Sequence, residues 1–247
     1  MILPDKKDAI HKAWLYRTLK AVCDNEKLVE KLCFKGGTCA AMRGFLDRFS
    51  VDLDFDFIGN ENEMDGARKE LEKVFVDLGL EIKEQSQKIP QYFLKYDSPQ
   101  NVRNTLKIDM SFPIPKTNKC EPTRLIEIDR IIKCQTIETM FANKLVALIE
   151  RFEKGNSIAG RDIYDTHYFF LNGYKYDPDV IKERRAVKDL KIFFQQLIEF
   201  VQKNITQELI DQDINFLLLP EKFRKIRKVI KDEVLIFLND EAGRAQH

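Results

Sequence analysis

Hydrophobic and polar residues alternate along residues 48–58, in the segment RFSVDLDFDFI. A period of two is typical of a β-strand that buries one face. The hydrophobic positions would point into the core, and the remaining positions would share the opposite face. That second face carries three acids at every other position: Asp52, Asp54 and Asp56.

Periodic patterns along the rest of the chain predict an α+β fold. Helical spacing predicts one or two short helices over residues 8–32 and one helix over residues 63–78, closed by Gly79. Four further strands are predicted in LEIKEQSQKI, QYFLKYD, NTLKIDMSF and RLIEIDRIIK. Helices follow over residues 137–152, 160–171, 189–204 and 221–238. We therefore expect a lobe with a mixed sheet and flanking helices over residues 1–135, and a helical lobe over residues 136–247.

A glycine turn precedes the strand that carries the three acids. The apolar run LCF leads into Gly36 and Gly37, and TCAAMRGFL then predicts a helix with Thr38 near its N-cap. Backbone N–H groups at such a junction can bind phosphate, although a tight turn without a ligand is an equally simple interpretation. The chain contains neither GxxxxGK[ST] nor GxGxxG, so the turn is neither a P-loop nor a Rossmann fingerprint.

The three acids favour a cation. Like charges on one strand face repel, and carboxylate oxygens suit Mg²⁺ or Mn²⁺; a solvated strand face is the alternative. A further acid, Asp109, lies in NTLKIDMSF on the face opposite Ile108 and Met110. A sheet that pairs the two strands, for example as a hairpin, would bring Asp109 beside Asp52 and Asp54. Taken alone, Asp109 could equally be an ordinary exposed acid.

Together, FKGGT and LDRFSVDLDF resemble the first motif of the AbiEii/AbiGii nucleotidyltransferase-like toxin family, within the DNA polymerase beta-type nucleotidyltransferase superfamily. The resemblance implies a nucleotidyltransferase-type sheet lobe. It also implies that a nucleoside triphosphate contacts Gly36, Gly37, Thr38 and Ser50, and that Mg²⁺ (or Mn²⁺) is held by Asp52, Asp54 and Asp109. Asp109 would in addition assist the attacking hydroxyl. Asp56 is then expected to be an outer or solvated acid, the one whose removal matters least.

Two later helices extend the resemblance. In TIETMFANKLVALIERF, Lys144 falls inside the apolar stripe, where the family has a lysine placed for the triphosphate; snorkelling to water is the alternative. The next helix begins GRDIYD, which places Asp162 and Asp165 on one side. The family has a similar RDxxDL-like element, but Thr166 stands here in place of its leucine. We therefore include both acids and Lys144 among the catalytic candidates, without choosing between the acids.

Charge and cysteine usage narrow the class of protein. Forty-one Lys and Arg balance 40 Asp and Glu, so any contact with a polyanion must be local. The basic segment EKFRKIRKVIKDEV predicts such a patch, which could also be a merely solvated helix face. Five scattered cysteines without CxxC spacing predict reduced thiols rather than disulfides or zinc. The sequence shows no signal-peptide pattern and no apolar run of membrane-spanning length, which predicts a cytoplasmic protein without a membrane partner.

The resemblance implies a metal-dependent nucleotidyltransferase that acts as the toxin of a toxin–antitoxin or phage-defence system. The expected partners are an NTP substrate, an RNA acceptor, with tRNA as the first candidate, and a cognate antitoxin. One alternative is a nucleotidyltransferase that modifies a small molecule or a protein. Another is a non-catalytic nucleotide-binding module. A DxD glycosyltransferase would share the use of a metal, but the glycine turn disfavours it.

Overall fold

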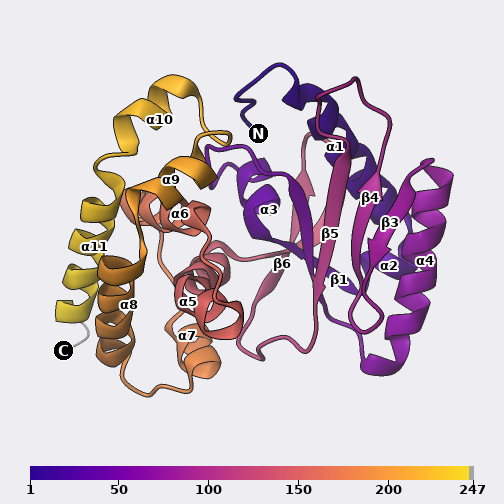
Figure 1. Ribbon diagram of the computed structural model, residues 1–247. Coiled ribbons are helices and arrows are strands. Elements are labelled where there is room, and N and C mark those ends of the chain that lie inside the picture. Colours follow the sequence, from indigo (N-terminus) through magenta and orange to yellow (C-terminus); the bar gives the residue numbers. More distant parts are fainter. Residues whose placement is uncertain (245–247) are drawn as a thin grey trace. The chain divides into compact units, whose positions relative to one another are not determined.

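The computed structural model describes residues 1–244, and the chain divides into two compact units (Figure 1). The α/β unit comprises Met1–Ile114 and Lys119–Thr136. The helical unit comprises Pro115–Asn118 and the chain from Ile137 onward. Residues 115–118 belong to the helical unit because the backbone N–H groups of Lys116 and Thr117 each donate to the Glu183 carboxylate at 2.8 Å.

A seven-stranded mixed sheet forms the centre of the α/β unit, and it confirms the predicted fold class. The strand order is β3-β4-β5-β2-β1-β7-β6. Strand β2 runs antiparallel to β1 and parallel to β5. Because they are parallel, β2 and β5 do not form a hairpin. The strands are β1 (Leu32–Lys35), β2 (Asp52–Phe57), β3 (Glu81–Gln85), β4 (Gln91–Lys95), β5 (Thr105–Ser111), β6 (Cys120–Leu125) and β7 (Arg130–Gln135).

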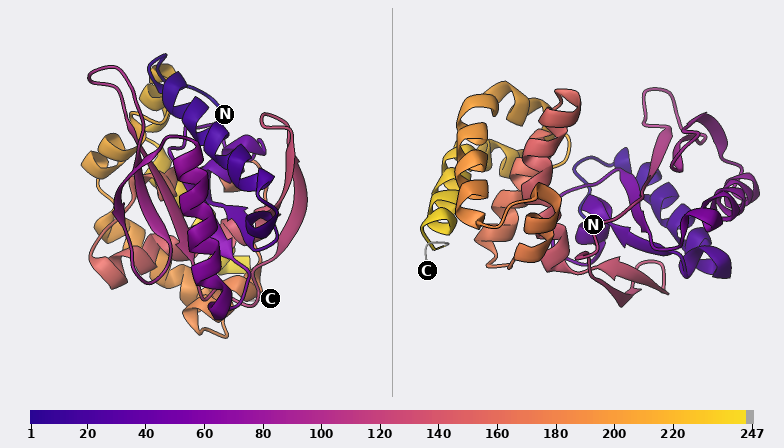
Figure 2. Two further views of the ribbon diagram at one scale, coloured as in Figure 1. Left: turned by 90° about the vertical axis from the view of Figure 1, so that its right-hand side faces the viewer. Right: turned by 90° about the horizontal axis from the view of Figure 1, so that it is seen from below.

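Helices α1 and α4 cover one face of this sheet, as the left view of Figure 2 shows. The hydrophobic positions of the strands face these helices. Ile108 of β5 is fully buried, and Phe75 of α4 packs edge-on against Tyr92 of β4 with ring centroids 4.9 Å apart. The polar positions of β2 and β5 therefore point away from α1 and α4. The helical segments of this unit are α1 (Asp8–Asp24), α2 (Glu26–Val29), α3 (Gly36–Met42), the 3₁₀ turn η1 (Glu61–Glu63) and α4 (Met64–Asp77).

The helical unit packs around aromatic side chains. Phe141 contacts Phe169 and Phe170 edge-on, with ring centroids 5.2 and 4.7 Å apart. The helices are α5 (Ile137–Gly155), α6 (Gly160–Leu171), α7 (Pro178–Arg185), α8 (Leu190–Asn204), α9 (Gln207–Ile214), α10 (Pro220–Ile226) and α11 (Ile230–Arg244). Gly160 fits at the start of α6 because a Cβ there would lie 2.8 Å from the backbone oxygen of Leu209.

Several predicted elements differ from those observed. Residues 124–133, predicted as one strand, instead contain the turn between β6 and β7, where Asp129 adopts a positive φ of 49°. The predicted helix over residues 221–238 is divided into α10 and α11. Helices α7 and α9 have no counterpart among the predicted elements. At eight residues each, they are too short to produce a clear periodic pattern.

The prediction that all five cysteines are reduced is wrong. Cys33 of β1 and Cys120 of β6 form a disulfide, with Cα atoms 6.4 Å apart. They are 87 residues apart in the sequence, and only the folding of the sheet brings them together. The other three cysteines are free and buried: Cys23, Cys39 and Cys134.

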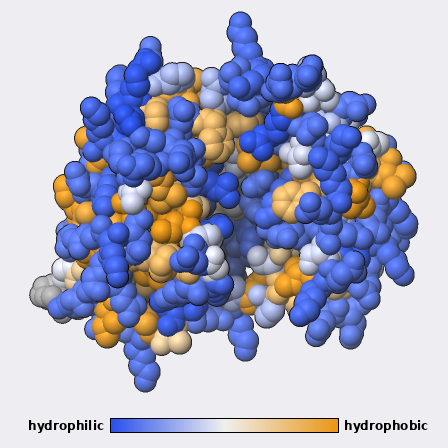
Figure 3. All heavy atoms as spheres, in the orientation of Figure 1, coloured by the Kyte–Doolittle hydropathy of each residue, from blue (hydrophilic) through white to orange (hydrophobic). Residues whose placement is uncertain are grey.

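The molecular surface is mainly hydrophilic on the face shown in Figure 3, with hydrophobic residues scattered among hydrophilic ones. Within residues 1–244, no helix combines the length and the hydrophobicity needed to cross a membrane.

Candidate active site

The glycine turn packs directly against the acidic strand. Gly36 has a φ of +76°, a conformation that side chains disfavour, and a Cβ at this position would lie 2.9 Å from the Asp54 Cβ. A Cβ on Gly37 would lie 2.6 Å from Arg48 Nη2 and 2.8 Å from Ser50 Oγ. Both glycines are therefore needed for this close approach, which joins the two halves of the sequence motif.

Thr38 and Ser50 also belong to this junction. Thr38 lies near the N-cap as predicted but does not cap the helix, because α3 begins at Gly36 and Thr38 is in its first turn. The Thr38 hydroxyl instead donates to the Asp52 backbone oxygen at 2.5 Å, which ties α3 to β2. Ser50 is 8% exposed and lies beside the turn.

Strand pairing brings the predicted carboxylates onto one sheet face. In the parallel ladder of β2 and β5, Asp54 lies directly opposite Asp109, and Asp52 lies opposite Lys107. Residues opposite each other in a ladder point to the same side of the sheet. The expectation that the two strands pair and place Asp109 beside the first acids therefore holds, although by parallel rather than hairpin pairing.

Asp109 is held by two neighbours on the same face. Its Oδ2 accepts a hydrogen bond from Lys107 Nζ at 2.5 Å and another from Gln91 Nε2 at 3.1 Å. Both bonds use Oδ2, and Oδ1 has no hydrogen-bond partner within the described part of the chain. The side chain of Asp109 is 31% exposed.

The description of Asp56 as a solvated acid is wrong, while its place as an outer acid of the site stays a prediction. Asp56 is 1% exposed, and its carboxylate accepts from Lys35 Nζ at 2.6 Å and from Gln135 Nε2 at 2.5 Å. Lys35 also donates to Ser111 Oγ at 2.7 Å. The ion pair joins β1 to β2, and its hydrogen bonds to Ser111 and Gln135 extend the network to β5 and β7. We therefore expect Asp56 to help hold these strands together beside the candidate site.

In the helical unit, Lys144 joins the two candidate acids rather than snorkelling. Its Nζ lies 2.7 Å from Asp162 Oδ1 and 2.8 Å from Asp165 Oδ2, and both acids have no exposed surface. Arg151 Nε lies 2.9 Å from Asp162 Oδ2. Burial alone would raise the pKa of Asp162, but the charges of Lys144 and Arg151 outweigh it and hold that pKa below its ordinary value. Lys144 thus contacts both acids, and both stay candidates for a functional role.

The carboxylate oxygens on the polar sheet face fit a magnesium ion whose other coordination positions are filled by water and phosphate. Among residues 1–244, no three His, Cys, Asp or Glu side chains are grouped to hold an ion by themselves. Mg²⁺ usually takes only one or two protein carboxylates and fills its remaining positions with water and phosphate. Asp54 and Asp109, opposite each other on one polar face, can supply such a pair.

The sequence patterns did not identify several polar residues around this site. Gln91 and Lys107 orient Asp109, while Lys35 and Gln135 hold Asp56. Arg48 is 2% exposed and donates to the Phe49 backbone oxygen. The available signal was the strand period, which places Lys107 in phase with Asp109; the partners on other strands depend on the sheet order.

Comparison with known sequences decides the family. Residues 17–234 match the family described as Nucleotidyl transferase AbiEii toxin, Type IV TA system. The chain belongs to the AbiEii toxin family. Membership supports a nucleotidyltransferase that acts as a toxin, and it implies a nucleotide substrate and an antitoxin partner. No curated protein matches the chain.

Solved structures confirm the nucleotidyltransferase fold of this AbiEii member. MenT4, a nucleotidyltransferase toxin from Mycobacterium tuberculosis H37Rv, superposes with a TM-score of 0.60 at 16% identity, over 97% of this chain and 87% of MenT4. JHP933 from Helicobacter pylori superposes with a TM-score of 0.53 at 18% identity, over 99% of this chain and 98% of JHP933. At such low identity the likeness is one of fold alone.

Proposed function

We propose that this AbiEii family protein is a metal-dependent toxin that transfers a nucleotide from an NTP to tRNA. The observation that carries the proposal is the packing of the glycine turn against Asp54, which itself lies opposite Asp109 on one polar sheet face. This packing would combine a phosphate-binding backbone with metal-binding carboxylates, as transfer of a nucleotidyl group requires.

The glycine turn and Ser50 would hold the triphosphate. The N–H groups of Gly36, Gly37 and Thr38 are the donors we assign to phosphate oxygens. Since the Thr38 hydroxyl is already bonded to the Asp52 backbone, its contribution is to fix the turn on β2. The Ser50 hydroxyl lies beside Gly37 and would add a further donor.

Asp52, Asp54 and Asp109 would hold Mg²⁺ or Mn²⁺ together with the nucleotide. When bound, the cation would neutralise phosphate charge and polarise the reacting phosphoryl group. Asp109 Oδ1 is the atom we assign to accept the proton of the attacking hydroxyl, because Lys107 and Gln91 already occupy Oδ2. The hydroxyl oxygen then bonds to the α-phosphorus while the bond to the pyrophosphate oxygen breaks.

Lys144 is assigned a phosphate contact. An ammonium group has three N–H donors, and Asp162 and Asp165 use two of them. The third is the one we assign to a phosphate oxygen of the departing pyrophosphate. In this proposal the two buried acids orient the lysine.

Transfer assays test the proposal. Each of the four NTPs, labelled at the α-phosphate, is incubated with Mg²⁺ and total tRNA, with the wild type, Asp52→Ala or Asp77→Ala. Asp77 is an exposed acid at the end of α4 and serves as the matched control. We expect label in tRNA with the wild type and Asp77→Ala, and none with Asp52→Ala. A fully active Asp52→Ala enzyme would refute the assigned site.

The same assay separates the alternative acceptors. Label on a small molecule or on protein in place of RNA would keep the transferase chemistry and reject the tRNA acceptor. If no label is transferred and calorimetry detects no binding of Mg²⁺-NTP, the protein is not a nucleotidyltransferase.

The biological role is tested in cells. We propose that the protein acts in the cytoplasm and that its expression arrests growth. The cognate antitoxin would relieve the arrest, and the pair would protect against phage. Growth curves with wild type and Asp52→Ala, with and without the antitoxin, would test the arrest and its relief. Arrest that persists in Asp52→Ala would separate toxicity from nucleotide transfer.

A further inference from the structure

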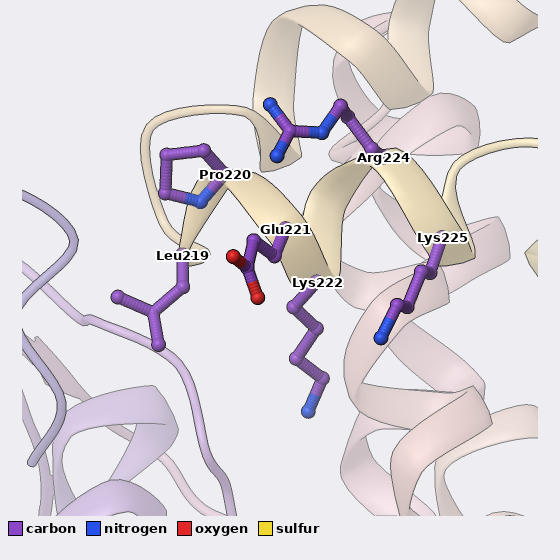
Figure 4. Close-up of a pocket in the computed structure, with 6 residues that line it drawn as sticks. All are labelled: Leu219, Pro220, Glu221, Lys222, Arg224 and Lys225. Carbon is purple, nitrogen blue, oxygen red and sulfur yellow. The ribbon is translucent and has the colours of Figure 1, made fainter.

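A basic surface lies on α10 in the helical unit. Figure 4 shows Lys222 and Lys225 extending from the same side of this helix, with Glu221 beside Lys222 toward Leu219 at the start of the helix. These side chains line a hollow on the protein surface together with Pro220 and Arg224. We call Lys222, Lys225 and the ring of Tyr168 described below the α10 surface.

The bases near α10 differ in what they contact. Arg227 is paired with Asp211, and Lys231 donates to the backbone oxygens of Gln202 and Ile205 at 3.0 and 2.7 Å, so both stabilise the unit itself. Lys225 is exposed, and it makes no hydrogen bond or ion pair with any residue in 1–244. Its charge is therefore available to a ligand.

Two aromatic rings lie beside Lys222. Lys222 Nζ lies 5.2 Å from the ring centroid of Tyr168 and 5.6 Å from that of Tyr164. The two rings stack at an interplanar angle of 24°, and Tyr168 is only partly buried. Leu219 is 44% exposed and extends the apolar part of the surface. Cations next to a ring platform are the combination used to bind single-stranded nucleic acid.

We propose that the α10 surface binds the backbone of a single-stranded RNA segment, with Lys222 and Lys225 on phosphates and Tyr168 against a base. The inference deepens the proposed function, because it rests on RNA being the acceptor. A protein partner could pair acidic side chains with Lys222 and Lys225, but it would have no need of the Tyr168 ring. The near-zero net charge of the chain makes a local basic site necessary for any RNA contact.

The test measures binding of a fluorescein-labelled single-stranded RNA by anisotropy across a range of salt concentrations. Each phosphate contact to single-stranded nucleic acid contributes about 0.7 to the slope of log affinity against log salt. Loss of two contacts in Lys222→Ala/Lys225→Ala should therefore lower the slope by about 1.4 and weaken binding roughly 25-fold at about 0.1 M salt. Lys188→Ala/Lys203→Ala removes the same charge from exposed sites elsewhere in the unit and should change the affinity less than about twofold.

A variant with one substitution avoids any disturbance of Tyr164 and Tyr168 by the loss of Lys222. Lys225→Ala alters an exposed side chain without partners in the described chain, and it alone should weaken binding about fivefold. Thermal melting compares the folding of all variants. Wild-type affinity and salt slope in Lys225→Ala and in the double variant would overturn the proposal, and so would an equal loss in the control. Tighter binding of poly-glutamate than of RNA at Lys222 and Lys225 would assign the surface to a protein instead.

Parallel assays keep this inference distinct from the proposed function. If the wild type binds RNA through the α10 surface but transfers no nucleotide, the proposed function fails and the surface stands. If it transfers nucleotides to another acceptor and binds no RNA, the surface proposal fails and the transferase stands.

Discussion

Replacing Gly36 by alanine tests the contact between the glycine turn and the acidic strand. The substitution has two costs that the structure separates. The φ of +76° disfavours any side chain, at about 1–2 kcal/mol. The new Cβ would also lie 2.9 Å from the Asp54 Cβ and Cγ. Ordinary carbon contacts are about 3.5–4.0 Å, so the turn and Asp54 must separate by roughly 1 Å.

Gly44→Ala is the matched control for the first cost. Gly44 has a φ of +77°, and a Cβ there would meet no atom within 4 Å. Both variants should lose about 1–2 kcal/mol of unfolding free energy, and Gly36→Ala should lose a further 0.5–1.5 kcal/mol, approximately, if Asp54 leaves its preferred rotamer. Urea denaturation of the two variants measures the difference directly.

Activity should distinguish the two variants more sharply than stability. A displacement of roughly 1 Å at a reacting centre can lower a rate about 100-fold. We therefore expect about that loss of nucleotide transfer in Gly36→Ala and near wild-type transfer in Gly44→Ala, measured under conditions where both are folded. If Gly36→Ala keeps its activity and is no less stable than Gly44→Ala, the close approach of the turn to Asp54 has no part in the chemistry.

Three further predictions concern buried ionisable side chains. Asp56→Asn should lower the unfolding free energy by about 2–3 kcal/mol in urea, because Lys35 loses a buried partner; an unchanged midpoint would contradict the structural role of Asp56. Lys144→Met should cost about 3 kcal/mol or more, since Asp162 and Asp165 would remain buried without this cation, whereas Lys144→Arg, which keeps the charge, should lose less. Burial lowers the pKa of His11 from 6.5 to about 4, so the unfolded chain binds a proton between these values that the folded chain does not. Unfolding free energy should therefore fall by about 3 kcal/mol from pH 6.5 to 4, and denaturation of His11→Gln, which cannot titrate there, should lack this part of the pH dependence.

The strand period was a sufficient guide to the faces of β2 and β5. It placed Asp52, Asp54 and Asp109 on polar faces, and the structure has these strands as neighbours. The order of strands in the sheet could not be read in the same way, because it depends on contacts between distant segments. Parallel pairing of β2 with β5 is one such contact.

The partners of the buried charged side chains also could not be predicted from the sequence. The pattern of residues 48–58 treats the three acids alike, yet Asp56 alone is sealed by Lys35 and Gln135, which come from other strands. The same limit applies to Lys144: helical spacing located it in an apolar stripe, and only the packing of α5 on α6 reveals its two acidic partners. The burial of a charge is a property of the folded neighbourhood rather than of a local pattern.

The Cys33–Cys120 disulfide encloses the candidate site of the α/β unit within one covalent loop. The loop contains both glycines of the turn, Thr38, Ser50 and the carboxylates of Asp52, Asp54 and Asp109. A protease that cuts once inside it leaves two pieces that still migrate as a single chain until the bond is reduced. A single band on a non-reducing gel therefore does not establish that the backbone around the site is uncut, and preparations of variants should be compared after reduction.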